Sequence, residues 1–187
     1  KSQPDWFNAP VPTWVPFDGD TSVQTLIIGL APGLKGANRT GVPFTGDSAG
    51  DTLFATLKSV GLARGDFTQE PNPSMHLVGC AITNAVRCVP PKNRPTGAET
   101  NTCTRRYLAR TIRRFVSLRR VITLGKIAHD ATVRTLGHRI ADHPFGHNAR
   151  SRVGDLQLIA SYHCSRYNMN TGRLTAAMFA TIFDEGD

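Results

Sequence analysis

The chain has 187 residues, a formal net charge of +8 and a pI near 9.9, with 40% hydrophobic and 19% charged residues. This length and balance fit one globular domain and exclude a disordered or fibrous protein. No apolar run approaches the length of a membrane span. The basic excess favours a polyanionic partner such as a nucleic acid, although a ribosome- or membrane-surface protein could carry the same charge.

The first clear strand leads into a loop rich in glycine and proline. Residues 23–29 read as a buried strand, and the glycines that follow let the backbone approach a ligand closely. In a parallel sheet, ligands bind just beyond the carboxyl ends of the strands. Phe44 lies in this loop, and its ring either folds back on the core or stacks on a bound planar ring.

Helix and strand signals then alternate. Ser48 can cap a helix over residues 48–60. Residues 76–83 read as a second strand that runs into Asn84. An Asn at this position is either a turn former or a carboxamide that reads a ring edge, since it offers both donors and acceptors.

A long basic helix is predicted over residues 96–118. Its buried face is marked by Leu108, Ile112 and Phe115. Its arginines are Arg105, Arg106, Arg110, Arg113 and Arg114. They form either a solvated face or a surface that contacts phosphates.

Residues 120–125 and 156–160 read as the third and fourth strands. Four strands alternating with helices imply an α/β fold, a three-layer α/β/α sandwich with a central, mainly parallel four-stranded sheet. We expect a single domain over residues 1–187, with residues 1–22 packing on it as an extended segment.

The parallel sheet brings the loops after the first, second and fourth strands to one edge. Phe44, Asn84 and His163 are therefore expected around a single pocket. His129 and His138 have no spaced metal partner and read as surface histidines. A zinc site at His143 and neighbouring His147 is not expected, because Pro and Gly between them argue against one helix face.

Several motifs together resemble the uracil-DNA glycosylase superfamily, and are most similar to its family 5, also called type b. They are GLAPG (29–33), GANRTG (36–41), PFTGD (43–47), ITNAVRCVPP (82–91), the segment with His163, and TGRLT (171–175). The resemblance covers nearly the whole chain. It implies a monofunctional enzyme that flips uracil out of DNA and hydrolyses its N-glycosidic bond.

The resemblance also implies site residues. Catalysis would involve Asn84, His163 and Asn168, to which we add Asp47 as our own candidate. The base would be held by Ala31, Gly33, Phe44 and Asn84. DNA would be contacted by Asn38, Arg39, Ser161, Ser165 and Arg166. His163 would donate a hydrogen bond to a uracil oxygen and act electrostatically.

Two positions depart from the superfamily pattern. Leu30 stands where many members have a polar residue that orients the attacking water. Asp47 is our first candidate for that role, and Asp51 or Asn38 is the next. Asp47 could instead serve only as an anion at a helix N-terminus. Cys164 replaces the usual Pro and puts a thiol beside His163.

Four cysteines follow no secreted disulfide pattern. By the resemblance, Cys88 and Cys103 are two of the four ligands of a [4Fe-4S] cluster, and the other two would lie upstream of Lys1. Either the chain is truncated there or the cluster has been lost. Cys80 reads as a buried hydrophobic residue.

The expected partner is uracil-containing DNA, single- or double-stranded, with no membrane contact and no nucleotide cofactor. We expect a cytoplasmic monomer, and the first ten residues show no signal peptide. Two alternatives stay open. The domain could bind bases without cleaving, or the glycine loop could hold a nucleotide phosphate, although no GxxxxGK[ST] motif supports the latter.

Overall fold

A computed structural model describes residues 3–70, 74–91 and 94–184. The main sheet has the strand order β4-β1-β5-β7-β6. Its strands are β1 (Thr25–Gly29), β4 (Cys80–Asn84), β5 (Arg120–Leu124), β6 (Ala149–Val153) and β7 (Leu156–Ser161). The first four strands in this order are parallel, and β6 is antiparallel to β7. The expected α/β architecture is confirmed, with five strands in place of four.

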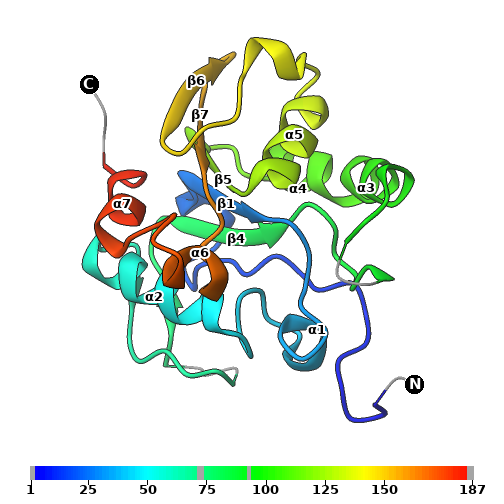
Figure 1. The fold of residues 1–187 in the computed structure, drawn as a ribbon, viewed down its shortest axis with the longest axis vertical. Helices are drawn as coiled ribbons and strands as arrows, with labels where there is room; N and C mark the ends of the chain where they lie inside the picture. Colours follow the sequence, from blue (N-terminus) through cyan, green and yellow to red (C-terminus); the bar gives the residue numbers. More distant parts are fainter. Residues whose placement is uncertain (1–2, 71–73, 92–93, 185–187) are drawn as a thin grey trace.

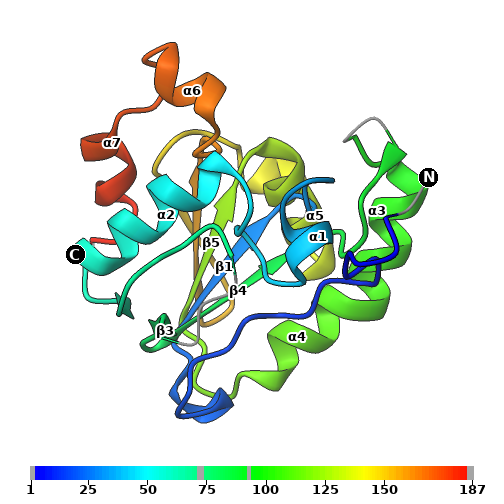
Figure 2. The ribbon, with the colours of Figure 1, turned by 90° about the horizontal axis from the view of Figure 1, so that it is seen from below.

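Helices cover both faces of the sheet, which makes three layers (Figures 1 and 2). One side carries α2 (Ser48–Ser59) and α7 (Ala176–Thr181), and the other carries α3 (Gly97–Cys103), α4 (Ala109–Arg114) and α5 (Lys126–Thr135). The short helices α1 (Ala37–Thr40) and α6 (Arg166–Asn170) belong to the loops after β1 and β7. A small hairpin pairs β2 (Ala63–Arg64) with β3 (His76–Leu77). Single 3-10 turns lie at Asp20–Ser22 and Ile140–Asp142.

Strand β1 supplies both layers of the core. Side chains alternate along a strand, so Ile27 packs with α2 and α7 while Leu26 and Ile28 pack on the opposite face. All three are fully buried. Burying an aliphatic side chain of this size contributes about 1.5–3 kcal/mol, and β1 is therefore fixed firmly where its loop begins.

The long basic helix is continuous but ends at Arg114 and contains one π-helical turn, Thr104–Leu108. Thr96 and Glu99 form a capping box at its start. Its five arginines are exposed, as expected for a solvated face, while Leu108 is buried.

Strand β6 was not expected from the sequence, because its residues ARSRV are largely polar and only its last side chain is buried. An edge strand needs little apolar character, since one of its sides faces solvent.

The expectation of a surface histidine is wrong for His129. Its ring is 2% exposed, with Nδ1 lying 3.1 Å from Thr123 Oγ1 and Nε2 lying 2.8 Å from the carbonyl oxygen of His143. Both ring nitrogens thus have partners in the core. His138 is exposed, as expected.

The N-terminal segment lies along β4. Trp14 and Ile82 exchange two backbone hydrogen bonds of 2.9 Å, and the Trp14 ring packs on Phe54. Within the described residues, no helix is both long and apolar enough to cross a membrane.

Candidate active site

A small pocket lies where the loops after β1, β4 and β7 meet, and we call it the carboxyl-end pocket. Its volume is about 190 Å³. It is lined by Ala31, Pro32, Gly33, Ala37, Phe44, Asp47, Ala49, Asn84 and His163. The structure thus brings together the three residues expected around one pocket, and it adds Asp47.

Gly29 allows two of these side chains to meet. It pairs in register with Asn84 at the ends of β1 and β4. A Cβ at Gly29 would lie 2.7 Å from Cζ of Phe44 and would also collide with Asn84 Oδ1. Phe44 and Asn84 therefore occupy the space that a side chain at position 29 would fill.

Phe44 is both buried and part of the pocket wall. Its backbone has a φ of 60°, which is unfavourable for a bulky residue. Such a conformation costs about 1–3 kcal/mol and persists where a site requires it. Its ring lies 6.0 Å from that of His163, with 20° between the planes.

His163 follows β7 and is held by the next helix. Asn168 Nδ2 donates a 2.8 Å hydrogen bond to the His163 carbonyl oxygen, and the Ser165 hydroxyl caps α6. Burial lowers the pKa of His163 below its usual value, and the nearby charge of Asp47 opposes that shift. The imidazole is therefore neutral at neutral pH and carries one N–H donor.

Asp47, and not Ser48, is the N-cap of α2. Its Oδ1 accepts hydrogen bonds from the backbone N–H groups of Ala49 at 3.0 Å and Gly50 at 3.4 Å. Its Oδ2 faces the glycine loop, where a Cβ at Gly36 would lie 2.9 Å from it. One carboxylate therefore caps a helix with one oxygen and borders the pocket with the other.

The two alternatives to Asp47 lie elsewhere. Asp51 is exposed and accepts a hydrogen bond from Gln69. Asn38 donates to Asn8 Oδ1 at 3.2 Å. Neither lines the carboxyl-end pocket.

The residues expected to contact DNA have different surroundings. Arg166 is exposed on α6. Arg39 forms an ion pair with Glu70, with nitrogen–oxygen distances of 2.6 and 2.9 Å. The expectation is wrong for Ser161, because that residue is fully buried and its hydroxyl bonds to the Tyr162 carbonyl oxygen.

Cys164 is a core residue despite its place beside His163. It is fully buried, and its thiol lies 3.5 Å from the carbonyl oxygen of Ala49 in α2. Burial raises the pKa of this thiol to about 12. It therefore joins the His163 loop to α2 as a neutral, unreactive group.

Sequence reasoning missed the small pocket residues Pro32, Ala37 and Ala49. They lie in or beside the motif segments, but only the structure shows that their short side chains form the wall.

Cys88 and Cys103 line a second cavity, of about 560 Å³, between the β4 loop and α3. The backbone N–H of Arg87 donates to Cys103 Sγ at 3.2 Å, and the buried Arg87 Nε has no partner among the described residues. A half-buried guanidinium and a backbone N–H donor beside sulfur suit an anionic thiolate group. Yet the described residues contain no group of three or more metal-ligating side chains, so these two thiols are at most half of a four-sulfur site.

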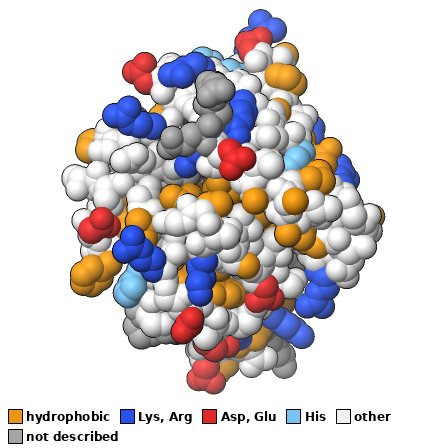
Figure 3. All heavy atoms as spheres, turned by 90° about the vertical axis from the view of Figure 1, so that its left-hand side faces the viewer, with side chains coloured by type: hydrophobic (Ala, Val, Ile, Leu, Met, Phe, Trp, Pro, Cys, Tyr) orange, Lys and Arg blue, Asp and Glu red, His pale blue; other side chains and the backbone are white. Residues whose placement is uncertain are grey.

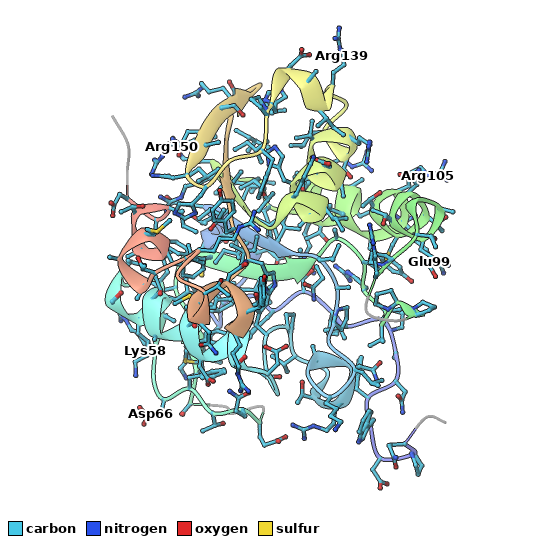
Figure 4. All side chains as sticks on the ribbon, in the orientation of Figure 1. Lys58, Asp66, Glu99, Arg105, Arg139 and Arg150 are labelled. Carbon is cyan, nitrogen blue, oxygen red and sulfur yellow. The ribbon has the colours of Figure 1, made fainter. Side chains whose placement is uncertain are left out.

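Charged side chains are spread over the surface. Figure 3 shows basic, acidic and apolar side chains interspersed on one face. The charged residues labelled in Figure 4, among them Glu99, Arg105 and Arg139, lie at the periphery of the molecule. On the face drawn in Figure 3, charged side chains therefore do not outline a site.

Comparison with known proteins gives consistent matches. Residues 16–185 match the family described as the uracil DNA glycosylase superfamily. The chain is 40% identical to the type-5 uracil-DNA glycosylase of Thermus thermophilus, over 99% of this chain and 82% of the relative. It is 36% identical to that of Pyrobaculum aerophilum, over 95% of this chain and 75% of the relative. A type-4 uracil-DNA glycosylase of Pyrobaculum aerophilum is 35% identical over 67% of this chain and 56% of its own length.

Proposed function

The chain belongs to the uracil-DNA glycosylase superfamily, and from this premise we propose that it is a DNA repair enzyme that hydrolyses the N-glycosidic bond of uracil in DNA. The observation that carries the proposal is the carboxyl-end pocket, which joins an aromatic ring, a carboxamide, a neutral imidazole and a carboxylate. Its volume of about 190 Å³ is below the roughly 300–1,000 Å³ of pockets that enclose drug-sized ligands. It suits one flipped base better than a whole nucleotide.

Phe44 and Asn84 hold the base in this proposal. The Phe44 ring offers a stacking face, which every planar base can use. The Asn84 carboxamide offers a donor and an acceptor, which match a uracil carbonyl and the adjacent ring N–H. The backbone at Ala31 and Gly33 completes the wall on the side of the loop after β1.

His163 stabilises the leaving base. Negative charge develops on the uracil oxygens as the glycosidic bond breaks, and a fixed donor in a dry site lowers the energy of that charge. The depressed pKa of His163 keeps the imidazole neutral, so it can donate a hydrogen bond without transferring a proton. Asn168 is a positioning residue, because its bond goes to the His163 backbone.

Asp47 orients the attacking water. Leu30 is aliphatic and cannot do so, whereas the Asp47 carboxylate borders the pocket. Because one oxygen is committed to the α2 cap, the other is held in a fixed direction. A fixed acceptor is what a water nucleophile needs.

The test is a cleavage assay on an oligonucleotide with a single uracil, in single-stranded, U:A and U:G contexts, with alkali to open abasic sites. We expect breaks only at the uracil, and only after alkali. The His163→Ala variant should be slower by roughly 10²-fold or more, the size of a lost oxyanion donor. The Arg110→Gln variant, altered on the exposed face of α4, is the matched control and should keep the parent rate.

Tight binding of uracil-containing DNA without breaks would contradict this function and favour a non-catalytic base reader. Binding of free nucleotides in place of DNA would favour a nucleotide enzyme. A His163→Ala rate within about threefold of the parent would remove the proposed role of His163.

We further propose that Cys88 and Cys103 supply two of four sulfur ligands to an iron–sulfur cluster if a longer form of the chain provides two further cysteines upstream of Lys1. The shared cavity and the Arg87 donor support this. Such a group would serve structure in this position, because the carboxyl-end pocket contains neither cysteine. Reconstitution with iron and sulfide should give cluster absorbance only in a longer chain that contributes two more cysteines.

We also propose that the chain acts as a monomer in the cytoplasm. All four cysteines are free, which is typical of a reducing compartment. Light scattering at several protein concentrations should give the mass of one chain, and a mass that rises with concentration would contradict this.

A further inference from the structure

We propose that this protein has a second anion site, for phosphate groups, at the edge of the sheet opposite to the carboxyl-end pocket. A cavity of about 370 Å³ lies there, which we call the amino-end cavity. It is lined by Gln24, Thr25, Arg119, Arg120, Arg152, Asp155 and Gln157. Nothing in the proposed glycosylase chemistry uses these residues.

The strand register builds this cavity. Thr25 of β1 pairs with Arg120 of β5, Arg120 pairs with Gln157 of β7, and Gln157 pairs with Arg152 of β6. Side chains of register partners point to the same face of a sheet. The four residues therefore form one row across the sheet, with one arginine on each side of the Gln157 carboxamide.

The row places the two arginines at a useful spacing. Neighbouring strands are about 4.8 Å apart, so the backbones of Arg120 and Arg152 lie two strand spacings from each other. Because the Arg120 guanidinium bonds to Thr25 of β1, on the side away from β6, the side chains free to reach a ligand in the cavity are those of Arg119 and Arg152. Arg120 is already held in direction, since it donates to Thr25 Oγ1 at 3.1 Å and to the Phe183 carbonyl oxygen at 2.9 Å.

Arg150 provides an internal comparison, because it lies two residues before Arg152 on the same strand. Its guanidinium donates to Asn148 Oδ1 and to the carbonyl oxygens of Thr181 and Asp184. It serves the packing of α7 and lies at the periphery in Figure 4.

Arg119 and Arg152 differ from Arg150. Neither of their side chains makes a hydrogen bond or ion pair with any other residue in the described part of the chain. Both are exposed and line the amino-end cavity.

The chemistry of the lining selects the ligand. The lining carries three guanidinium groups and one carboxylate, and two of these guanidinium groups, those of Arg119 and Arg152, have no partner in the described part of the chain. Two glutamines add further N–H donors, and Asp155 is the one acidic side chain of the lining among the described residues. Guanidinium groups match phosphate oxygens in geometry and charge. A phosphate dianion therefore fits this lining better than a neutral or cationic ligand.

Two sources could deliver such a phosphate. One is a small phosphate ester or inorganic phosphate, and the other is the backbone of a second DNA segment. The base pocket lies at the carboxyl ends of β1, β4 and β7, whereas this cavity lies at the amino ends of β1, β5 and β7. A DNA segment here would thus be additional to the one whose base enters the carboxyl-end pocket.

The test is calorimetric titration of the full chain with inorganic pyrophosphate, as a compact polyphosphate probe. The parent should show saturable binding at one site. The Arg119→Gln/Arg152→Gln double variant should bind at least roughly tenfold more weakly, because charge-assisted hydrogen bonds to phosphate are lost. The Arg110→Gln/Arg113→Gln double variant loses the same charge from α4 and should bind like the parent.

To distinguish the two sources of the phosphate, we would measure the DNA affinity of each protein at several salt concentrations. If DNA is the source, the slope of log K for DNA binding against log salt concentration should be about two units shallower in the Arg119→Gln/Arg152→Gln variant, since each phosphate contact contributes about 0.9 to that slope. The α4 control should keep the slope of the parent. With a small phosphate as source, both variants should bind DNA alike while only the first loses pyrophosphate. Either result supports the site.

No saturable pyrophosphate binding to the parent, or equal affinity in all three proteins, would overturn the proposal. Uracil excision from a short single-stranded oligonucleotide should stay at the parent rate in the Arg119→Gln/Arg152→Gln variant. The proposed function and the phosphate site therefore fail independently.

Discussion

At the residue scale, His163 depends on burial for its protonation state. Desolvation disfavours the charged imidazole, and the Asp47 carboxylate only partly offsets this. A neutral donor is suited to an oxygen that gains negative charge during the reaction. The same burial makes the stability of the fold decrease in acid, because His163 binds a proton more readily in the unfolded chain than in the folded protein.

We predict that His163 titrates below its usual value of about 6.5, and lower still in the Asp47→Asn variant, because the charge that raises its pKa is gone. NMR titration of the imidazole protons measures both. A folded-state pKa below the unfolded one gives stability that is present above about pH 6.5 and declines as the pH falls below it. The His163→Gln variant should therefore lose less unfolding free energy between neutral and acidic pH. A higher pKa in Asp47→Asn would contradict this account.

Gly29 is the second residue on which the site depends. A methyl group there would displace Phe44 and Asn84, the two side chains proposed to hold the base. We predict that Gly29→Ala lowers the uracil excision rate by at least roughly tenfold and destabilises the fold by about 1–3 kcal/mol, as overpacking does. Gly97→Ala is the matched control, because a Cβ at Gly97 meets nothing within 4 Å. Full activity of Gly29→Ala would show that the close approach at β1 is not required.

At the element scale, the residue that caps α2, Asp47, also borders the pocket. We predict that Asp47→Ala loses both activity and about 0.5–2 kcal/mol of stability, the usual value of an N-cap. Asp47→Asn keeps a capping oxygen and should retain most of the stability while losing the activity. Urea unfolding and the cleavage assay separate these two effects. An active Asp47→Asn variant would restrict Asp47 to the helix cap.

The sequence predicted those elements whose signals are local. The apolar runs of β1, β5 and β7 and the loop glycines indicated the parallel sheet, and the parallel sheet in turn predicted that Phe44, Asn84 and His163 share a pocket. Strand β6 was missed because an edge strand needs few apolar residues. His129 was misjudged because its partner carbonyl lies 14 residues away. The sequence could not decide whether Asp47 caps the helix or borders the pocket, because one oxygen of its carboxylate caps α2 and the other faces the glycine loop.

At the scale of the whole molecule, the sheet separates two chemical edges. The carboxyl ends carry a small pocket with one carboxylate and a neutral imidazole, and the amino ends carry a cavity lined by arginines. Two apolar clusters, one on each face of the sheet, lie between these two edges. Groups inside those clusters should be chemically silent in the folded protein, even where they lie next to the site.

The reactivity of the cysteines tests whether groups inside the apolar clusters are unreactive in the folded protein. Cys80 and Cys164 are fully buried in the cluster beneath α2, and burial raises the pKa of each thiol to about 12. Cys103 is 8% exposed, whereas Cys88 is exposed. Alkylation depends on an accessible thiolate. We therefore predict that iodoacetamide labels one thiol of the native chain, Cys88, and all four after unfolding.

Mass spectrometry of the labelled protein counts and locates the modified residues, and Cys88→Ser serves as the control that should abolish native labelling. The pKa of Cys88 is itself raised by partial burial and by the neighbouring Cys103, so its reaction should be slower than that of an unfolded peptide thiol. Native labelling of Cys164 would mean that the loop carrying His163 opens away from α2. In that case the imidazole would be hydrated and charged more easily, and the neutral donor proposed for catalysis would lose its physical basis.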